Sequence, residues 1–330
     1  SSFFYFYILA FQIDFLAQWY LPHSFITFFI LMAFLLSSKK KIIFNLHLMT
    51  SSILILWNYP ELSNHGTLYI FSNFVLLFGN YFSKEIVFNV LKYALMIAYI
   101  WSGVHKINSG FLDPDISCAN EFFNKIFDST SKSSFITISI IMTEILFPVL
   151  LLSFKRVVFL LPLMIFHLLT AFIDLYDFMA IAFALHLLFL KEDKPRKEIF
   201  WPLALITFVA GIGLYPSLTG SYQGIYFSYI NYLFYFIYLL LYLYYFSSSL
   251  MQNINLNFKL KQLPIYLILN IHFLAPYLGV YTGGVFAMFS NLNTSYSHWN
   301  HYMIPREIHI FSKIESANHQ IQFNDYRCTW

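Results

Sequence analysis

Charged residues are scarce in this chain: only 11% of its 330 residues are Asp, Glu, Lys or Arg, whereas 59% are hydrophobic and 22% are aromatic. A soluble domain is usually about one quarter charged, and 40 Phe and 25 Tyr cannot all be buried in a water-soluble fold of this size. The mean hydropathy is +0.63. The composition therefore excludes an ordinary soluble domain and predicts an all-α polytopic membrane protein, with membrane lipid as its surroundings.

Several motifs of common enzyme classes are also absent. The sequence contains no glycine-rich phosphate loop, no CxxC pair and no HExxH motif, so nucleotide and zinc chemistry have no support in it. The formal net charge is only +3, and the basic residues lie in short clusters between apolar runs. This pattern argues against a nucleic-acid partner and favours signals that orient a protein in the membrane.

Eleven apolar runs are long enough, or nearly long enough, to cross a bilayer. They fall at about residues 3–20, 24–37, 42–57, 67–82, 86–104, 135–153, 157–174, 178–190, 199–215, 224–247 and 264–281. Twelve of the 19 basic residues follow even-numbered runs, and the positive-inside rule assigns that side to the cytoplasm. We therefore predict about eleven transmembrane helices (9–11), with the N-terminus inside and the C-terminus outside.

On this topology, residues 1–281 form one multi-span membrane domain and residues 282–330 form a short extracytoplasmic tail. The tail alternates apolar and polar residues at Glu307–Phe311 and again at Gln320–Phe323. This period of two predicts short β-strands. In the outer loop, residues 118–127 are expected to form an interfacial helix.

The two cysteines, Cys118 and Cys328, both fall on the predicted outer side. Disulfides are stable in that compartment. We hypothesise one bridge between them, which would tie the tail onto the loop that follows Lys106.

The most informative stretch is residues 92–112, where an aromatic, apolar run ends at Ser102-Gly103-Val104-His105-Lys106. A lysine in that position is unfavourable unless its side chain reaches the membrane surface (snorkels), pairs with an acidic group or takes part in the protein's function. Either Lys106 anchors a helix end, or partial burial favours its neutral amine, which can act as a base or polarise a substrate oxygen. His105 is adjacent, but neighbouring helical residues point about 100° apart, so the two need not act together.

Other polar residues lie in or beside predicted spans. Glu144 lies near the middle of its run, where a carboxylate is normally neutral, paired or functional; a structural hydrogen bond to a neighbouring helix is the alternative. His167, roughly 10 Å from the outer end of its span, is either a hydrogen-bonded core residue or a catalyst. Asn64 and His65 either cap a helix or form one wall of an outward-facing pocket.

Together these residues resemble the membrane domain of vitamin K-dependent γ-carboxylases and their bacterial relatives, the horizontally transferred transmembrane (HTTM) domain. The resemblance covers about residues 55–190. Its matching features are Pro60 through Asn64-His65, the aromatic span into Gly103-Val104-His105-Lys106 with Phe111-Leu112, and Glu144-Ile145-Leu146-Phe147-Pro148 followed by Phe166-His167. The tail segments Ala275–Gly279, Met288–Leu292 and Asn300-His301 look like a bacterial subgroup with this domain.

In the carboxylases, a lysine matching Lys106 deprotonates reduced vitamin K. The resemblance therefore implies a bacterial inner-membrane enzyme of carboxylase-like (lyase) chemistry, with a reduced quinone as cofactor. It implies the catalytic residues Lys106, His167 and His65, supported by His105, Glu144 and Asn64. The chain departs from the family in two ways. His105 replaces a basic residue of the Lys-Lys pair in the carboxylases, and only the short tail stands in place of their lumenal β-rich domain.

A different class of protein also fits the sequence. In this alternative the chain is a non-enzymatic membrane subunit that binds a membrane or extracytoplasmic partner in an envelope protein assembly. Its aromatic spans would present a lipid-embedded contact surface, its tail would dock the partner, and Lys106 would only anchor a helix. A transporter is less favoured, because the chain lacks clear inverted-repeat symmetry.

Overall fold

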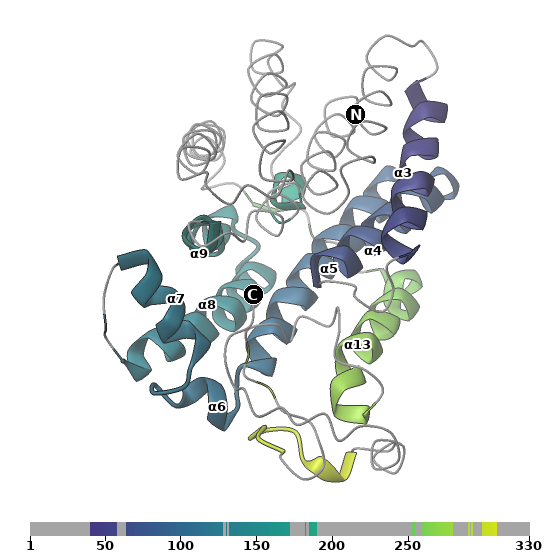
Figure 1. Cartoon of the computed structure of the whole chain (residues 1–330). Coiled ribbons are helices and arrows are strands. Elements are labelled where there is room, and N and C mark those ends of the chain that lie inside the picture. The colour runs from purple at the N-terminus through teal and green to yellow at the C-terminus, as the bar shows by residue number, and fades with distance from the viewer. Residues whose placement is uncertain are drawn as a thin grey trace, which may run out of the picture.

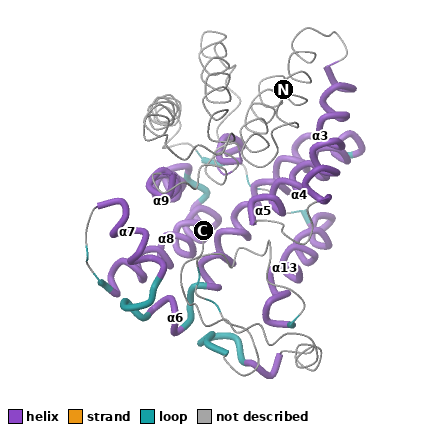
Figure 2. The backbone as a smooth tube through the Cα atoms, viewed as in Figure 1, coloured by secondary structure: helices purple, strands orange, loops and turns teal. Residues whose placement is uncertain are grey.

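The described part of the chain is mostly helical (Figures 1 and 2). The computed structural model describes residues 40–57, 64–127, 130, 132–171, 182, 185–189, 253–254, 256, 259–279, 290, 292 and 299–308. Within these ranges there is no strand, and two isolated antiparallel β-bridges join Asn108 to His301 and Arg156 to Asn253. The helical class predicted from composition is confirmed for these residues.

Seven helices make up most of the described structure. They are α3 (Lys40–Trp57), α4 (Asn64–Phe78), α5 (Lys84–His105), α7 (Cys118–Phe127), α8 (Ser134–Phe154), α9 (Leu161–Ala171) and α13 (Leu263–Leu278). The shorter elements are α6 (Ser109–Leu112), η1 (Gly79–Tyr81), η2 (Val157–Leu160), η3 (Leu187–Phe189), η5 (Leu260–Gln262) and η6 (Arg306–Ile308). The apolar runs predicted at 3–20, 24–37, 199–215 and 224–247 lie outside the described residues, and so does most of 178–190, so the count of eleven spans stays a prediction.

Within the described residues, two helices, α5 and α8, are long and apolar enough to cross a membrane. Each provides a stretch of 21 residues, or about 32 Å at the α-helical rise, which matches the thickness of a bilayer core. Serine caps start both helices: Ser83 accepts a hydrogen bond from the Ile86 N–H, and Ser133 accepts one from the Phe135 N–H. At the other end, α8 stops at Lys155, which adopts a left-handed conformation with φ of 52°.

Burial gives α5 and α8 different places in the bundle. Along the apolar window of α5, 67% of the residues are buried, and the helix packs against α4, α8 and α13. The corresponding value for α8 is 22%, and five of its exposed apolar residues follow helical spacing. They are Phe135, Ile138, Met142, Leu146 and Val149. Thus α5 is the central helix, and α8 presents an apolar stripe suited to contact with lipid.

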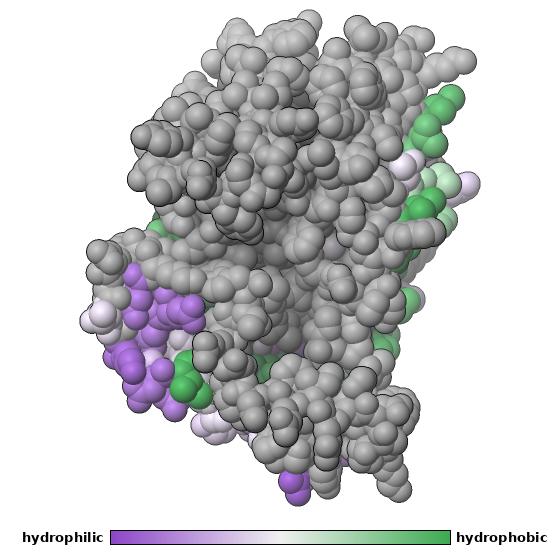
Figure 3. Space-filling view, in the orientation of Figure 1, coloured by the Kyte–Doolittle hydropathy of each residue, from purple (hydrophilic) through white to green (hydrophobic). Residues whose placement is uncertain are grey.

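The described surface separates by polarity. In Figure 3 hydrophobic side chains lie along the right edge, where Figure 1 places α3, and hydrophilic ones gather at the lower left, over α6 and α7. The exposed apolar residues of α3 recur on one face: Ile42, Leu46, Met49, Ile53 and Leu56. This separation is typical of helices that face lipid and loops that face water.

Helices α5 and α13 run parallel to each other. At one end, Lys259 Nζ lies 3.2 Å from Glu85 Oε2. At the other end, His105 Nδ1 lies 2.7 Å from the Tyr277 hydroxyl. The two helices therefore begin on the same side of the bundle, and the outward direction predicted for the runs at 86–104 and 264–281 stays a prediction.

The turn after α8 lies beside the segment that leads into α13. The Ile254 N–H donates to the Lys155 carbonyl at 2.7 Å, and Arg156 forms the bridge to Asn253. The residues before α13 therefore contact the turn that holds Lys155 and Arg156.

The helix expected at Cys118–Phe127 is confirmed as α7, which packs on α8. The prediction of a strand beginning at Glu307 is wrong for the described residues, since η6 (Arg306–Ile308) is a turn of 3₁₀-helix. The Ile308 N–H donates to the Pro305 carbonyl at 3.3 Å, and this turn bends the backbone away from the extended form. The remainder of the tail, including Gln320–Phe323, lies outside the described residues.

Cys118 is buried and disulfide-bonded. The other cysteine of the sequence, Cys328, lies outside the described residues, so the Cys118–Cys328 bridge stays a prediction. We expect the native protein to contain no free thiol. We also expect Cys118→Ser to lower the free energy of unfolding by about 2–5 kcal/mol, because the bridge closes a long loop. Mass spectrometry after alkylation checks the thiol content, and two alkylated cysteines in unreduced protein would contradict the bridge.

Candidate functional site

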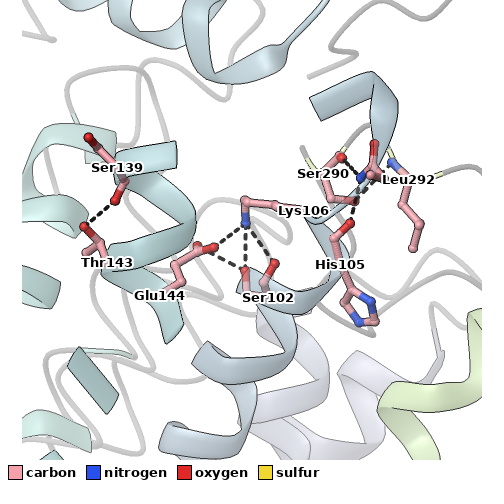
Figure 4. Close-up of polar contacts among 9 residues, drawn as sticks. Ser102, His105, Lys106, Ser139, Thr143, Glu144, Ser290 and Leu292 are labelled. Atoms are coloured by element: carbon pink, nitrogen blue, oxygen red, sulfur yellow. Dashed lines mark hydrogen bonds and ion pairs between the residues drawn. The ribbon is translucent and has the colours of Figure 1, made fainter. Parts of the chain in front are cut away.

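A buried ion pair joins α8 to the residue that caps α5. Lys106 Nζ lies 2.7 Å from Glu144 Oε2, and the side chains are 7% and 5% exposed. The Ser102 hydroxyl donates to Glu144 Oε1 at 3.1 Å and accepts from Lys106 Nζ at 2.9 Å. Figure 4 shows these three side chains, here called the Lys106 cluster, directed toward one another.

Local helix geometry explains why Lys106 points inward. Ser102 precedes Lys106 by four residues, so the two lie on one face of the helix. Lys106 caps α5, and its backbone N–H bonds the Gly103 carbonyl rather than that of Ser102. Lys106 Nζ donates to the Ser102 carbonyl instead, at 3.3 Å. The three ammonium protons thus face three acceptors, the Glu144 carboxylate, the Ser102 hydroxyl and the Ser102 carbonyl.

A glycine allows α5 and α8 to come close enough for this pairing. A Cβ atom at Gly103 would overlap Ile145 Cγ1, and would lie 3.1 Å from Ile145 Cδ1 and 3.2 Å from Glu144 Cβ. Any larger residue must therefore separate the two helices where Glu144 meets Lys106. Gly103 therefore matters for a steric reason, the close approach of the two helices, rather than for backbone flexibility.

The segment after Lys106 closes over the ammonium group. Asn108 caps α6 by accepting the Phe111 N–H on its side-chain oxygen at 2.9 Å. This turn brings the buried Phe111 ring to 5.9 Å from Lys106 Nζ, within the range of a cation–π contact.

His105 belongs to a different cluster from its neighbour Lys106. Its ring contacts the Trp101 ring, with centroids 5.6 Å apart, and its Nδ1 bonds the hydroxyl of Tyr277 on α13. The two adjacent side chains diverge in Figure 4. The expectation that they need not act together therefore fits the structure.

His167 is placed next to Tyr99, two helical turns before Lys106 on α5. Its buried ring lies 5.2 Å from the Tyr99 ring, and His186 Nε2 lies 3.2 Å from the Tyr99 hydroxyl. Seven residues along α5 correspond to about 10 Å, so this histidine–tyrosine cluster is separate from the Lys106 cluster. Among the described contacts, none joins His167 to Lys106.

Asn64 and His65 are the first residues of α4, and their side chains lie outside the described part of the structure. Their assignment to a shared site with Lys106 stays a prediction. Of the predicted site residues, the structure brings together Lys106 and Glu144.

Three residues of these clusters were not predicted from the sequence to be site residues. Ser102 could have been found from its four-residue spacing to Lys106, and Asn108 from its position as a helix cap before Ser109. Tyr99 carried no local signal, because a tyrosine in an aromatic span is ordinary.

The chain matches no family model, no curated protein and no solved structure. In the part of the chain that the structure describes, the fold and the site define a helical protein with two membrane-length helices and a buried Lys–Glu pair between them. The carboxylase resemblance remains a prediction from the residues alone.

Proposed function

We propose that the chain is an integral membrane enzyme in which the Lys106 cluster takes a proton from an O–H group of a lipid-soluble substrate. The observation that carries the proposal is the 2.7 Å contact between Lys106 and Glu144, both buried. A buried ion pair stabilises a fold weakly, since apolar residues of similar volume often do as well or better. Ionisable groups inside a membrane protein are therefore candidate functional groups by default.

The pair can hold a mobile proton. Transfer of one proton from Lys106 Nζ to Glu144 Oε2 converts two charges into a neutral amine and a neutral carboxylic acid. The neutral amine is then a base, and Ser102 keeps both partners in place through its two hydrogen bonds.

The residues present fit a reduced quinone, the cofactor class that the resemblance implies. Each Glu144 oxygen has one partner, Ser102 or Lys106, whereas a carboxylate oxygen can accept two hydrogen bonds. Glu144 and Lys106 would hold the hydroxyl, and Phe111 would lie beside it. When bound, a reduced quinone supplies the hydroxyl proton and reducing electrons.

Activity of Lys106→Met tests the proposal. We expect purified protein in nanodiscs of native lipid to oxidise a reduced menaquinone in the presence of O₂, and the variant to lose about 10²–10⁴-fold in rate, as expected for loss of a general base. The control is Lys259→Met, which removes the half-exposed pair with Glu85 and should retain the rate. Wild-type protein without quinol oxidation, or Lys106→Met at the wild-type rate, would contradict the proposal.

A second candidate function is the non-enzymatic membrane subunit. The observation that favours it is that the Lys106 ammonium already has three acceptors within the chain. The subunit interpretation expects a stoichiometric envelope-protein partner whose binding survives Lys106→Met, together with no quinol oxidation by the complex.

A further inference from the structure

We propose that tail residues 299–304 form a latch that positions Lys106, and that protonation of His301 releases this latch. The latch deepens the proposed function, on which the catalytic role of Lys106 rests. Its own existence rests on contacts among α5, α13 and the tail.

The backbone of the latch pairs with the residues that directly follow Lys106. The Ser109 N–H donates to the Asn300 carbonyl at 3.0 Å, and the Tyr302 N–H donates to the Ile107 carbonyl at 3.2 Å. These bonds flank the antiparallel bridge between Asn108 and His301. The tail therefore fixes the backbone of the turn between Lys106 and α6.

Asn108 fastens the same turn through its side chain. Nδ2 donates to the carbonyl of His105 at 2.8 Å and to that of Ser290 at 2.6 Å. Oδ1 accepts from Asn300 Nδ2 at 3.2 Å in addition to the Phe111 N–H. Since Asn108 is fully buried, water does not readily replace these bonds.

His301 completes the latch and makes it sensitive to protons. Its Nε2 lies 2.9 Å from the Val104 carbonyl, which can only accept, so Nε2 carries a proton. Its Nδ1 accepts from the N–H groups of Met303 and Ile304 at 3.2 and 3.0 Å, so Nδ1 carries none. One neutral tautomer satisfies all three contacts. A proton on Nδ1 would remove the acceptor and place a donor against two N–H groups.

The groups around His301 do not favour its charged form. On α13, the Tyr277 ring packs edge-on at 5.0 Å. On α5, His105 and Lys106 directly follow Val104, whose carbonyl His301 contacts. In the tail, Tyr302, Arg306 and Glu307 are exposed. Burial lowers the pKa of His301 from its usual value, partly offset by the hydrogen bond to Val104.

The direction of the pH response follows. A released His301 titrates near its ordinary pKa of about 6.5, whereas the latched residue binds a proton only at lower pH. The contribution of His301 to the stability of the closed latch is therefore complete above about pH 6.5. It is lost as the pH falls toward the pKa of the latched form. Between pH 7.5 and pH 5.0, latch opening should increase by up to about 30-fold, because a group of pKa 6.5 is protonated about 30:1 at pH 5.

Hydrogen–deuterium exchange of the full chain in nanodiscs tests the latch without any substrate. We expect peptides covering 299–305 and Ser109 to open up to about 30-fold more at pH 5.0 than at pH 7.5, after correction for the intrinsic exchange rate. His301→Asn keeps an acceptor for the N–H groups of Met303 and Ile304 but does not titrate. The increase in opening at pH 5.0 should therefore disappear in this variant. His272→Gln, on α13, is the matched histidine control and should keep it.

Opening that is unchanged by pH in the wild-type protein overturns the latch, even if His301→Asn fails to fold. A rise that persists in His301→Asn also overturns it. Failure of the proposed function appears elsewhere, as wild-type quinol oxidation that is absent or insensitive to Lys106→Met. The two results are therefore distinguishable.

Discussion

Glu144→Leu is expected to lower the free energy of unfolding by about 3–5 kcal/mol, because it leaves the Lys106 ammonium buried without its counter-charge. The double variant Lys106→Met/Glu144→Leu should recover most of this loss, since two apolar side chains of similar size need no partner. Thermal unfolding followed by tryptophan fluorescence in nanodiscs compares the three proteins. The single variant should unfold several degrees below the double variant.

An exposed ion pair supplies the matched control. Glu85 pairs with Lys259 at 3.2 Å, but their side chains are 46% and 39% exposed. Glu85→Leu should therefore change stability by no more than about 1 kcal/mol. A double variant as unstable as Glu144→Leu alone would show that Lys106 and Glu144 are not coupled.

Gly103→Ala is expected to cost about 1–3 kcal/mol of stability, the usual range for overpacking a tight contact. The new methyl group would overlap Ile145 Cγ1 and press on Glu144 Cβ, which pushes α8 away from α5. Helix propensity alone predicts the opposite sign, since Ala is favoured over Gly by about 1 kcal/mol within a helix. The sign of the change in melting temperature therefore separates close helix packing from propensity.

A second substitution checks that the cause is steric. Ile145→Ala removes the atoms that the new methyl group would meet, so Gly103→Ala/Ile145→Ala should be less destabilised than the sum of the two single variants. Strict additivity, or a Gly103→Ala protein more stable than wild type, would mean that the helices do not approach closely at Gly103.

Long apolar runs were sufficient to predict the principal helices. The runs at 86–104 and 135–153 correspond to α5 and α8, each extended slightly by a serine cap. The helix at Cys118–Phe127 was also predicted from the residues. Alternation in the tail was a poorer guide, because Pro305 starts a 3₁₀ turn where a strand was expected. A hydropathy pattern reports which side of a segment is apolar, but local turn chemistry decides whether the segment stays extended.

The candidate site was predictable residue by residue but not as a set. Lys106 and Glu144 each attracted attention because an ionisable group in an apolar span is costly. Their pairing depends on the register between α5 and α8, which Gly103 permits and which no single-helix pattern encodes. The same holds for the bond between Asn300 and Asn108, which are 192 residues apart.

His167 illustrates the limit most clearly. Sequence reasoning grouped it with Lys106 through a family resemblance, whereas the structure places its ring beside Tyr99, on another part of α5. His167 lies on α9, and its neighbour Tyr99 precedes Lys106 by seven residues, or about 10 Å along α5. A resemblance names residues, but only the packing shows which of them meet.

A cryo-EM map of the protein extracted with native lipid tests the central claim most directly. The account predicts Lys106 Nζ within hydrogen-bonding distance of the Glu144 carboxylate, beside Ser102 and between α5 and α8. A Lys106 side chain that instead extends to the lipid headgroups, with Glu144 bonded elsewhere, would contradict it. In that case Lys106 would be a helix anchor, and neither the proton-transfer site nor the role of the latch would stand.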